Sequence, residues 1–178
     1  MEYELRVSAR ARYLRVEVPF GGPPLVVVPR GVARARADAF LAEKRPWIER
    51  QLARQVRRLE LPPIAEPEGR RRARAAVTEV AEREAARLGL SVGRIRIADQ
   101  RSRWGSCSAR GTLSFNWRLA LAPFEVLDYV VVHELCHLRE PNHSRRFWAL
   151  VESARPGWRA QRAWLREHGP ELQAYRPA

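Results

Sequence analysis

The sequence predicts an α+β fold with two parts, and three observations support this class. Apolar and charged residues alternate in the first 30 residues, which is typical of strands with one buried face. Apolar residues at helical spacing dominate most of the remaining chain, with two short strand signals among them. A proline-rich stretch at residues 61–69 separates the two parts. With 178 residues, 46% of them apolar, the chain can bury a sizeable core.

Residues 1–60 are expected to form an accessory subdomain of β-strands followed by a helix. Residues 5–7 and 14–18 alternate, and an apolar run at 25–28 follows a glycine- and proline-rich turn at 21–24. A helical stretch begins near residue 33. Within this stretch, Pro46 either kinks the helix or starts a new one. Its apolar residues near helical spacing are Phe40, Leu41, Trp47, Ile48, Leu52 and Val56.

Residues 61–69 are the predicted linker between the two parts. Three prolines and a glycine within these nine residues should prevent a helix from continuing there. We therefore place a domain boundary at this segment, with the second domain at residues 70–178.

The second domain is expected to begin with an amphipathic helix and to end with three more helices. The first helix spans about 71–88, buries Ala73 and Val77, and stops at Gly89. Strand signals follow at 95–97 and 113–115, separated by a loop-like segment at 100–111. The last three helices are expected at about 123–139, before the Pro-Gly pair at 156–157, and before the Gly-Pro pair at 169–170.

Residues 133–137, His-Glu-Leu-Cys-His, together with His143 predict a single divalent-metal site. Two histidines four residues apart project from the same face of a helix, so His133 and His137 can occupy adjacent corners of a zinc tetrahedron. His143 supplies a third ligand. The fourth position then stays open for water, which distinguishes a catalytic zinc site from a structural one.

Glu134 is rotated past the ligand face and suits a general base that acts on water at the metal. The alternative is a buried helix whose histidines only satisfy hydrogen bonds in the core. The surrounding residues make this helix apolar nearly all round, so function is the main reason for three polar residues within it. These apolar neighbours are Val130, Val131, Val132, Leu135 and Leu138.

The net charge of +13 leaves two interpretations open. It is compatible with binding to polyanions such as nucleic acid. An alanine- and arginine-rich chain whose single lysine is Lys44 is also what strongly GC-rich coding would give. The arginines are spread along the whole length, and the cluster at 70–74 opens a helix with acids further on, which also fits a solvated face.

The sequence gives no sign of a secretory signal or a membrane span, so we expect a cytoplasmic protein. The first residues lack a positive flank and an apolar stretch, and no run approaches the ~18 apolar residues that a membrane helix needs. Two cysteines, Cys107 and Cys136, are too few for a disulfide framework. Reduced thiols are therefore expected.

Four short segments resemble the YgjP-like metallopeptidase family, which is itself similar to the WLM and SprT-type zincins. They are RWGSCS at 103–108, NWRL at 116–119, DYVV at 128–131 and NHS at 142–144 with FW at 147–148. The resemblance implies a zincin-like fold, with a small antiparallel sheet over two central helices and an accessory N-terminal β part. It also implies that His133, His137 and His143 hold zinc and that Glu134 is catalytic.

The segment at 103–108 is expected to border the active-site cleft as a strand and turn. There it could pair with an extended peptide through backbone hydrogen bonds. A packing motif, with Trp104 in the core and Gly105 required by the backbone, explains the same residues equally well. The residues that we expect to bind substrate are Arg103, Trp104, Gly105, Ser106 and Asn116.

The predicted function is zinc-dependent hydrolysis of peptide bonds, with Glu134 moving the proton. A second donor to the oxyanion is expected, and Tyr129, Arg103, Asn116 and His168 remain open for this role. One alternative is a zinc-dependent nucleotide phosphohydrolase, because several arginines lie beside the motif residues and could bind phosphates. A nucleotide pyrophosphatase activity has been associated with the YgjP-like group. The other alternative is a nucleic-acid-associated protein with structural zinc.

Overall fold

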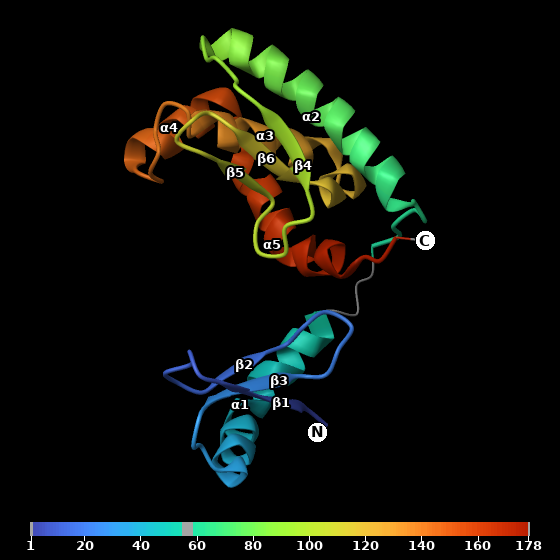
Figure 1. The fold of residues 1–178 in the computed structure, drawn as a ribbon, viewed down its shortest axis with the longest axis vertical. Coiled ribbons are helices and arrows are strands. Elements are labelled where there is room, and N and C mark those ends of the chain that lie inside the picture. The colour runs from blue at the N-terminus through green and yellow to red at the C-terminus, as the bar shows by residue number, and fades with distance from the viewer. Residues whose placement is uncertain (1, 55–58, 178) are drawn as a thin grey trace. The chain divides into compact units, whose positions relative to one another are not determined.

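The structure is a computed structural model that describes residues 2–54 and 59–177, in two compact units. The first unit spans residues 1–59 and the second 60–178, and each contains a three-stranded sheet, with one helix in the first unit and several in the second (Figure 1). The predicted α+β class is therefore confirmed. Within the described ranges, every helix is too short or too polar to span a bilayer.

The first unit is a small sheet covered by one helix. Its strands are β1 (Glu4–Ser8), β2 (Arg15–Glu17) and β3 (Leu25–Pro29), and β3 lies between a parallel β1 and an antiparallel β2. Helix α1 (Arg34–Arg54) buries Leu41 and Ile48 against the β3 side chains Val26 and Val28. The predicted strands are confirmed. Pro46 lies inside α1, so no second helix begins there, and Val56 falls outside the described residues.

Helix α2 (Glu66–Leu88) begins inside the predicted linker, so the expected helix start near Arg71 is wrong by five residues. Pro67 lies in the first turn, where its missing N–H costs no intrahelical hydrogen bond. A Cβ on Gly69 would lie 2.5 Å from a ring atom of Trp117, so this glycine allows close packing. The helix stops at Gly89 as predicted, with φ at 62°.

The sheet of the second unit contains β4 (Ile95–Ala98), β5 (Gly105–Cys107) and β6 (Leu113–Asn116), in the order β4-β6-β5. Strand β6 is parallel to β4 and antiparallel to β5, so the sheet is mixed and not antiparallel as the resemblance implied. Strand β5 also lies within the stretch at 100–111 that reads as a loop. Its residues Gly, Ser and Cys carry no apolar strand signal, but β5 agrees with the strand and turn that we expected at 103–108.

Helix α3 (Phe124–Cys136) lies at the centre of the second unit and packs on β5, β6, α2, α4 and α5 (Figure 1). A short 3₁₀ helix, η1 (Trp117–Leu121), precedes it, and α4 (Arg145–Ala154) and α5 (Trp158–Ala174) follow. Helix α5 continues past the predicted stop at Gly169 and Pro170. Gly169 packs beside the indole of Trp104, and Leu172 beyond it is fully buried, so tertiary packing compensates for the hydrogen bond that Pro170 removes.

A buried ionic cluster ties α2 and α3 to the end of α4. Glu84 on α2 and Asp128 on α3 are only 3% and 7% exposed, and the Arg155 guanidinium reaches each carboxylate at 2.8 Å. Arg83 donates to Asp128 and Arg87 to Glu84. Burial alone would raise the pKa of Glu84, but these hydrogen bonds outweigh it and lower that pKa from 4.5 to about 2.

Candidate active site

The end of α3 and the start of α4 bring three histidines together. His133 lies in the last turns of α3, and His137 follows its last helical residue with helical φ and ψ angles. The chain then reverses, and the Ser144 side chain caps α4 by accepting a hydrogen bond from the backbone N–H of Phe147. This cap fixes the position of His143 immediately before α4.

The three imidazoles lie close enough together that they could hold one metal ion. Their available nitrogens lie within 4.8 Å of one another, and Nε2 of His133 is 2.9 Å from Nε2 of His143. Two nitrogens on a tetrahedral zinc ion would be roughly 3.3 Å apart. His137 Nδ1 lies 3.1 Å from the carbonyl oxygen of Glu140, and donation to that oxygen leaves its Nε2 lone pair free for a metal.

The surroundings favour the neutral form of His133 and His143, the form that metal binding requires. Burial lowers the pKa of His133 to about 3, and the charges of His137, His143 and Arg162 add to this effect. Burial, His137 and Arg162 also lower the pKa of His143. The geometry of the three imidazoles and the lowered pKa values of His133 and His143 therefore fit a zinc ion.

Aromatic side chains surround the histidines and hold their rings. Phe147 stacks on His137, with ring centroids 4.4 Å apart, and Trp148 stacks on His143 at 5.5 Å. Tyr129 contacts His133 edge-on at 5.8 Å. Because His143 is exposed and lies outside any helix, the Trp148 contact is important for its orientation.

Glu134 is buried between α3 and β5, with only 7% of its surface exposed. Burial raises its pKa to about 7, although the nearby charge of Arg103 opposes this shift. A Cβ on Gly105 would lie 2.6 Å from both Cγ and Oε1 of Glu134. The carboxyl group therefore lies directly against the β5 backbone, with a pKa suited to proton transfer near neutral pH.

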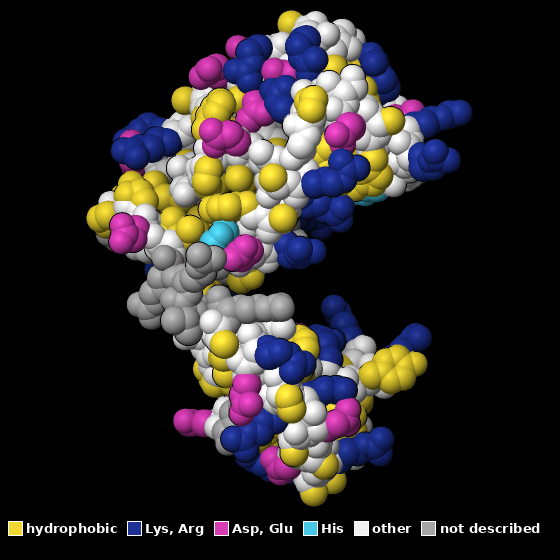
Figure 2. Space-filling view, turned by 180° about the vertical axis from the view of Figure 1, so that it is seen from behind, with side chains coloured by type: hydrophobic (Ala, Val, Ile, Leu, Met, Phe, Trp, Pro, Cys, Tyr) yellow, Lys and Arg dark blue, Asp and Glu magenta, His cyan; other side chains and the backbone are white. Residues whose placement is uncertain are grey.

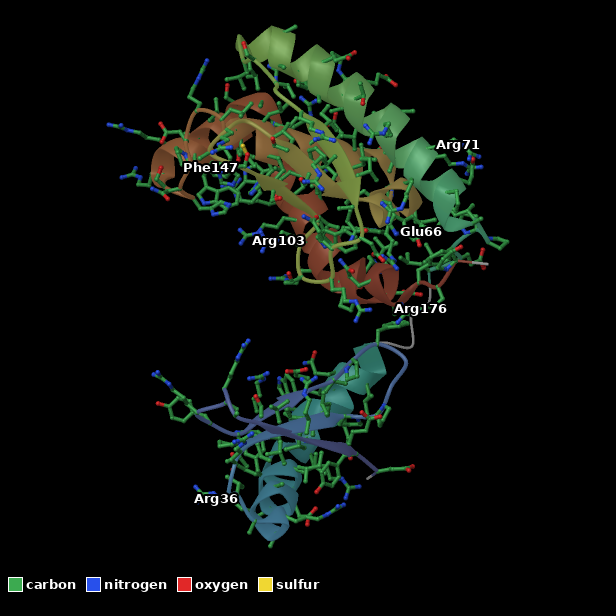
Figure 3. The ribbon with its side chains drawn as sticks, viewed as in Figure 1. Arg36, Glu66, Arg71, Arg103, Phe147 and Arg176 are labelled. Atoms are coloured by element: carbon green, nitrogen blue, oxygen red, sulfur yellow. The ribbon has the colours of Figure 1, made fainter. Side chains whose placement is uncertain are left out.

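A cleft of about 850 Å³ opens at the three histidines and Glu134. Four of the five residues predicted to bind substrate line it, namely Arg103, Trp104, Gly105 and Ser106. Arg103 points outward from the loop that leads into β5 (Figure 3). Trp104 also packs against the main core, so it serves both the cleft and the packing.

The structure does not support the prediction for Asn116, which lies outside the cleft lining and is fully buried. Its side-chain oxygen caps η1 by accepting from the Arg118 N–H, and its amide donates to the Gln100 carbonyl oxygen. His168, also considered for the oxyanion, packs on Trp164 away from the lining. Tyr129 and Arg103 do line the cleft, and burial raises the Tyr129 pKa to about 12, so its hydroxyl stays protonated.

Sequence reasoning missed Arg162, which lies on α5 beside the site. Its guanidinium carbon is 5.0 Å from the ring centroid of Trp148 and 5.7 Å from that of Trp158. Nothing in the sequence near residue 162 indicates that this arginine lies at the site. It reaches the site only because α5 packs against α3 and α4.

Three convergent imidazoles, an adjacent buried carboxyl group and an open cleft define the type of site found in metal-dependent hydrolases. The family model described as "YgjP-like, metallopeptidase domain" matches residues 66–168, more than half of the chain. The chain belongs to the YgjP-like metallopeptidase family, as the resemblance had indicated.

Two solved structures of metallopeptidase zymogens are similar to this chain. Abylysin of Pyrococcus abyssi is 28% identical, with a TM-score of 0.46, over 52% of this chain and 92% of that chain. Jannalysin of Methanocaldococcus jannaschii is 21% identical, with a TM-score of 0.44, over 51% of this chain and 91% of that chain. A comparison with curated proteins gave no match.

Proposed function

We propose that the protein is a zinc-dependent metallopeptidase in which His133, His137 and His143 hold the ion and Glu134 is the general base. The observation that carries this proposal is the convergence of three imidazoles beside a buried carboxyl group. When bound, zinc would supply a Lewis acid that acidifies water and polarises the substrate carbonyl.

In the proposed reaction, Glu134 accepts a proton from the water molecule that attacks the carbonyl carbon of the peptide bond. The C–N bond then breaks as Glu134 returns this proton to the leaving amine nitrogen. A pKa of about 7 lets the same carboxyl group act as base and then as acid near neutral pH. The Tyr129 hydroxyl lines the cleft and is proposed to donate to the developing oxyanion.

Strand β5 is proposed to hold the substrate backbone. It lies at one edge of its sheet, and within the described residues it pairs only with β6. All three of its residues, Gly105, Ser106 and Cys107, line the cleft. An extended peptide could add to this edge by main-chain hydrogen bonds, which would place a scissile bond beside Glu134.

The structure gives less support to the nucleotide alternative. Of the arginines beside the sequence motifs, Arg118 and Arg139 donate to the carbonyl oxygens of Tyr175 and Leu88, whereas Arg103 lines the cleft. The described part of the chain contains one cluster of potential metal ligands, whereas phosphoryl chemistry often uses two ions.

The nucleic-acid alternative with structural zinc is also less well supported. In the described residues, the three histidines have no fourth histidine, cysteine or carboxylate within ligand distance, although structural zinc sites normally have four protein ligands. On the face in Figure 2, basic side chains are spread over both units among acidic ones.

The decisive experiment compares wild-type protein with Glu134→Gln for zinc content and for hydrolysis of an unfolded protein and of nucleoside triphosphates. We expect both proteins to bind one zinc ion and only the wild type to cleave the unfolded protein. Glu125→Gln, an exposed glutamate in the first turn of α3, is the matched control and should retain activity. Peptide cleavage that persists in Glu134→Gln, or triphosphate cleavage alone, would contradict the proposal.

A further inference from the structure

Two guanidinium groups near the site, those of Arg103 and Arg162, form no salt bridge among the described residues. Arg103 lines the cleft on the β5 side, and its positive charge partly opposes the effect of burial on the pKa of Glu134. Arg162 lies on the α5 side, above Trp148, whose ring stacks on His143. Both side chains are exposed; Arg103 lines the cleft, whereas Arg162 lies beside it, outside the lining.

Comparison with Arg159, a neighbouring arginine on α5, shows that Arg162 differs in having no salt bridge among the described residues. Arg159 lies over the same Trp158 ring, but its guanidinium pairs with Glu152 at 2.6 Å. Arg162 is held by two aromatic rings instead, and these orient its guanidinium without neutralising its charge. A guanidinium that lies over an aromatic ring can still donate hydrogen bonds from its N–H groups to an anion.

The cleft itself contains little that would neutralise these charges. Among the described residues, Glu134 is the one acidic side chain in its lining, and the mechanism already uses it. A metal ion would add two further positive charges at the histidines. An anionic group on a substrate would therefore meet a positive potential in the cleft.

We propose that the site selects peptides that carry a carboxylate close to the scissile bond, and that Arg103 and Arg162 bind this carboxylate. The inference rests on the proposed function, because it takes a peptide as the ligand of the cleft. Arg103 would act from the β5 side and Arg162 from the α5 side, each by charge-assisted hydrogen bonds. The carboxylate could belong to an Asp or Glu side chain or to the C-terminus of the peptide.

Binding to the zinc-loaded Glu134→Gln protein tests the inference without turnover. Fluorescein-labelled peptides with blocked ends and a neutral sequence would carry Glu or Gln at one position, and anisotropy would give their Kd. We expect the Glu peptide to bind about tenfold more tightly. Adding Arg103→Gln or Arg162→Gln should reduce this preference to less than about threefold, whereas Arg159→Gln, the stacked but paired control, should preserve it.

Zinc content is measured in every variant, so a lost preference cannot be confused with lost metal. A parent peptide with a free C-terminal carboxylate, compared with its amide, tests the second source of the carboxylate. Equal binding of all carboxylate and neutral peptides would overturn the inference. A preference that survives the double arginine substitution would also overturn it, because zinc would then be binding the carboxylate.

Turnover separates this inference from the proposed function. If wild-type protein cleaves neutral and acidic peptides equally, the carboxylate preference is wrong and the peptidase function stands. If acidic peptides bind through the two arginines but no peptide is cleaved, the peptidase proposal fails and the carboxylate site stands. If the arginines affect triphosphate hydrolysis and leave peptide binding unchanged, the inference is overturned in favour of a phosphate site.

Discussion

Gly105 and Glu134 lie so close together that a Cβ on Gly105 would stand 2.6 Å from the Cγ and Oε1 atoms of Glu134. The φ angle of Gly105 is not positive, so the backbone conformation itself does not require glycine. What requires it is the approach of α3 to β5, which presses the proposed general base against the strand proposed to hold the substrate.

We therefore expect Gly105→Ala to displace the Glu134 carboxyl group and to lower kcat by about 100-fold or more. Zinc content should stay at one ion, because the atoms nearest to a Cβ on Gly105 belong to Glu134 and not to the histidines. Steady-state kinetics and elemental analysis would check this, with Gly22→Ala in the first unit as a glycine-to-alanine control. A Gly105→Ala protein with wild-type kcat would show that Glu134 does not need this position.

The histidine cluster and the β5 side of the cleft could be predicted because their residues lie close together in the sequence. His133 and His137 lie four residues apart on one helix, and Arg103 to Ser106 form a contiguous run. Arg162 and the Trp148–Trp158 stack could not be predicted in this way, because they depend on how α4 and α5 pack on each other.

The predicted helix boundaries were wrong where tertiary packing outweighs local propensity. Gly69 and Gly169 both read as helix breakers, yet each lies in a helix where its missing side chain admits an indole ring. The partner rings, Trp117 and Trp104, are about 48 and 65 residues away in the chain, so no local pattern could indicate these contacts.

Removal of the third proposed ligand should weaken zinc binding without unfolding the protein. His143 is exposed and precedes α4, so His143→Ala leaves the core intact. We expect zinc affinity to fall by at least about 100-fold, with the circular dichroism spectrum unchanged. A chelator competition assay would measure the affinity, and His168→Ala, outside the cleft, is the control. Full zinc occupancy in His143→Ala under competition would mean that the ligand is misassigned.

Trp148 is expected to stabilise the orientation of His143. Its ring stacks on that imidazole with an interplanar angle of 23°, and no helix restrains the histidine. Trp148→Leu should therefore lower zinc affinity by about tenfold, within the range known for residues that orient a ligand. Trp164→Leu is the matched control, because Trp164 contacts His168 and not a proposed ligand. Equal zinc affinities of the two variants would contradict this role.

The buried cluster of Glu84, Asp128 and Arg155 predicts a specific loss of stability in acid. The pKa of Glu84 is about 2 in the folded protein, below its ordinary value of 4.5. A carboxyl group with a lowered pKa stabilises the fold fully above pH 4.5, and this contribution is lost as the pH falls toward 2. The whole contribution is at most about 3 kcal/mol.

Comparison of wild-type protein with Glu84→Gln isolates this contribution. Urea unfolding of the metal-free proteins should give a free-energy difference that is largest near pH 6 and shrinks steadily between pH 4.5 and 2.5, because the protonated glutamic acid then resembles glutamine. Glu79→Gln, which removes an exposed partner of Arg83 on the same helix, should show almost no such pH dependence. If the difference between wild type and Glu84→Gln stays constant over this range, the cluster does not hold Glu84 ionised, and its contacts contribute through packing alone.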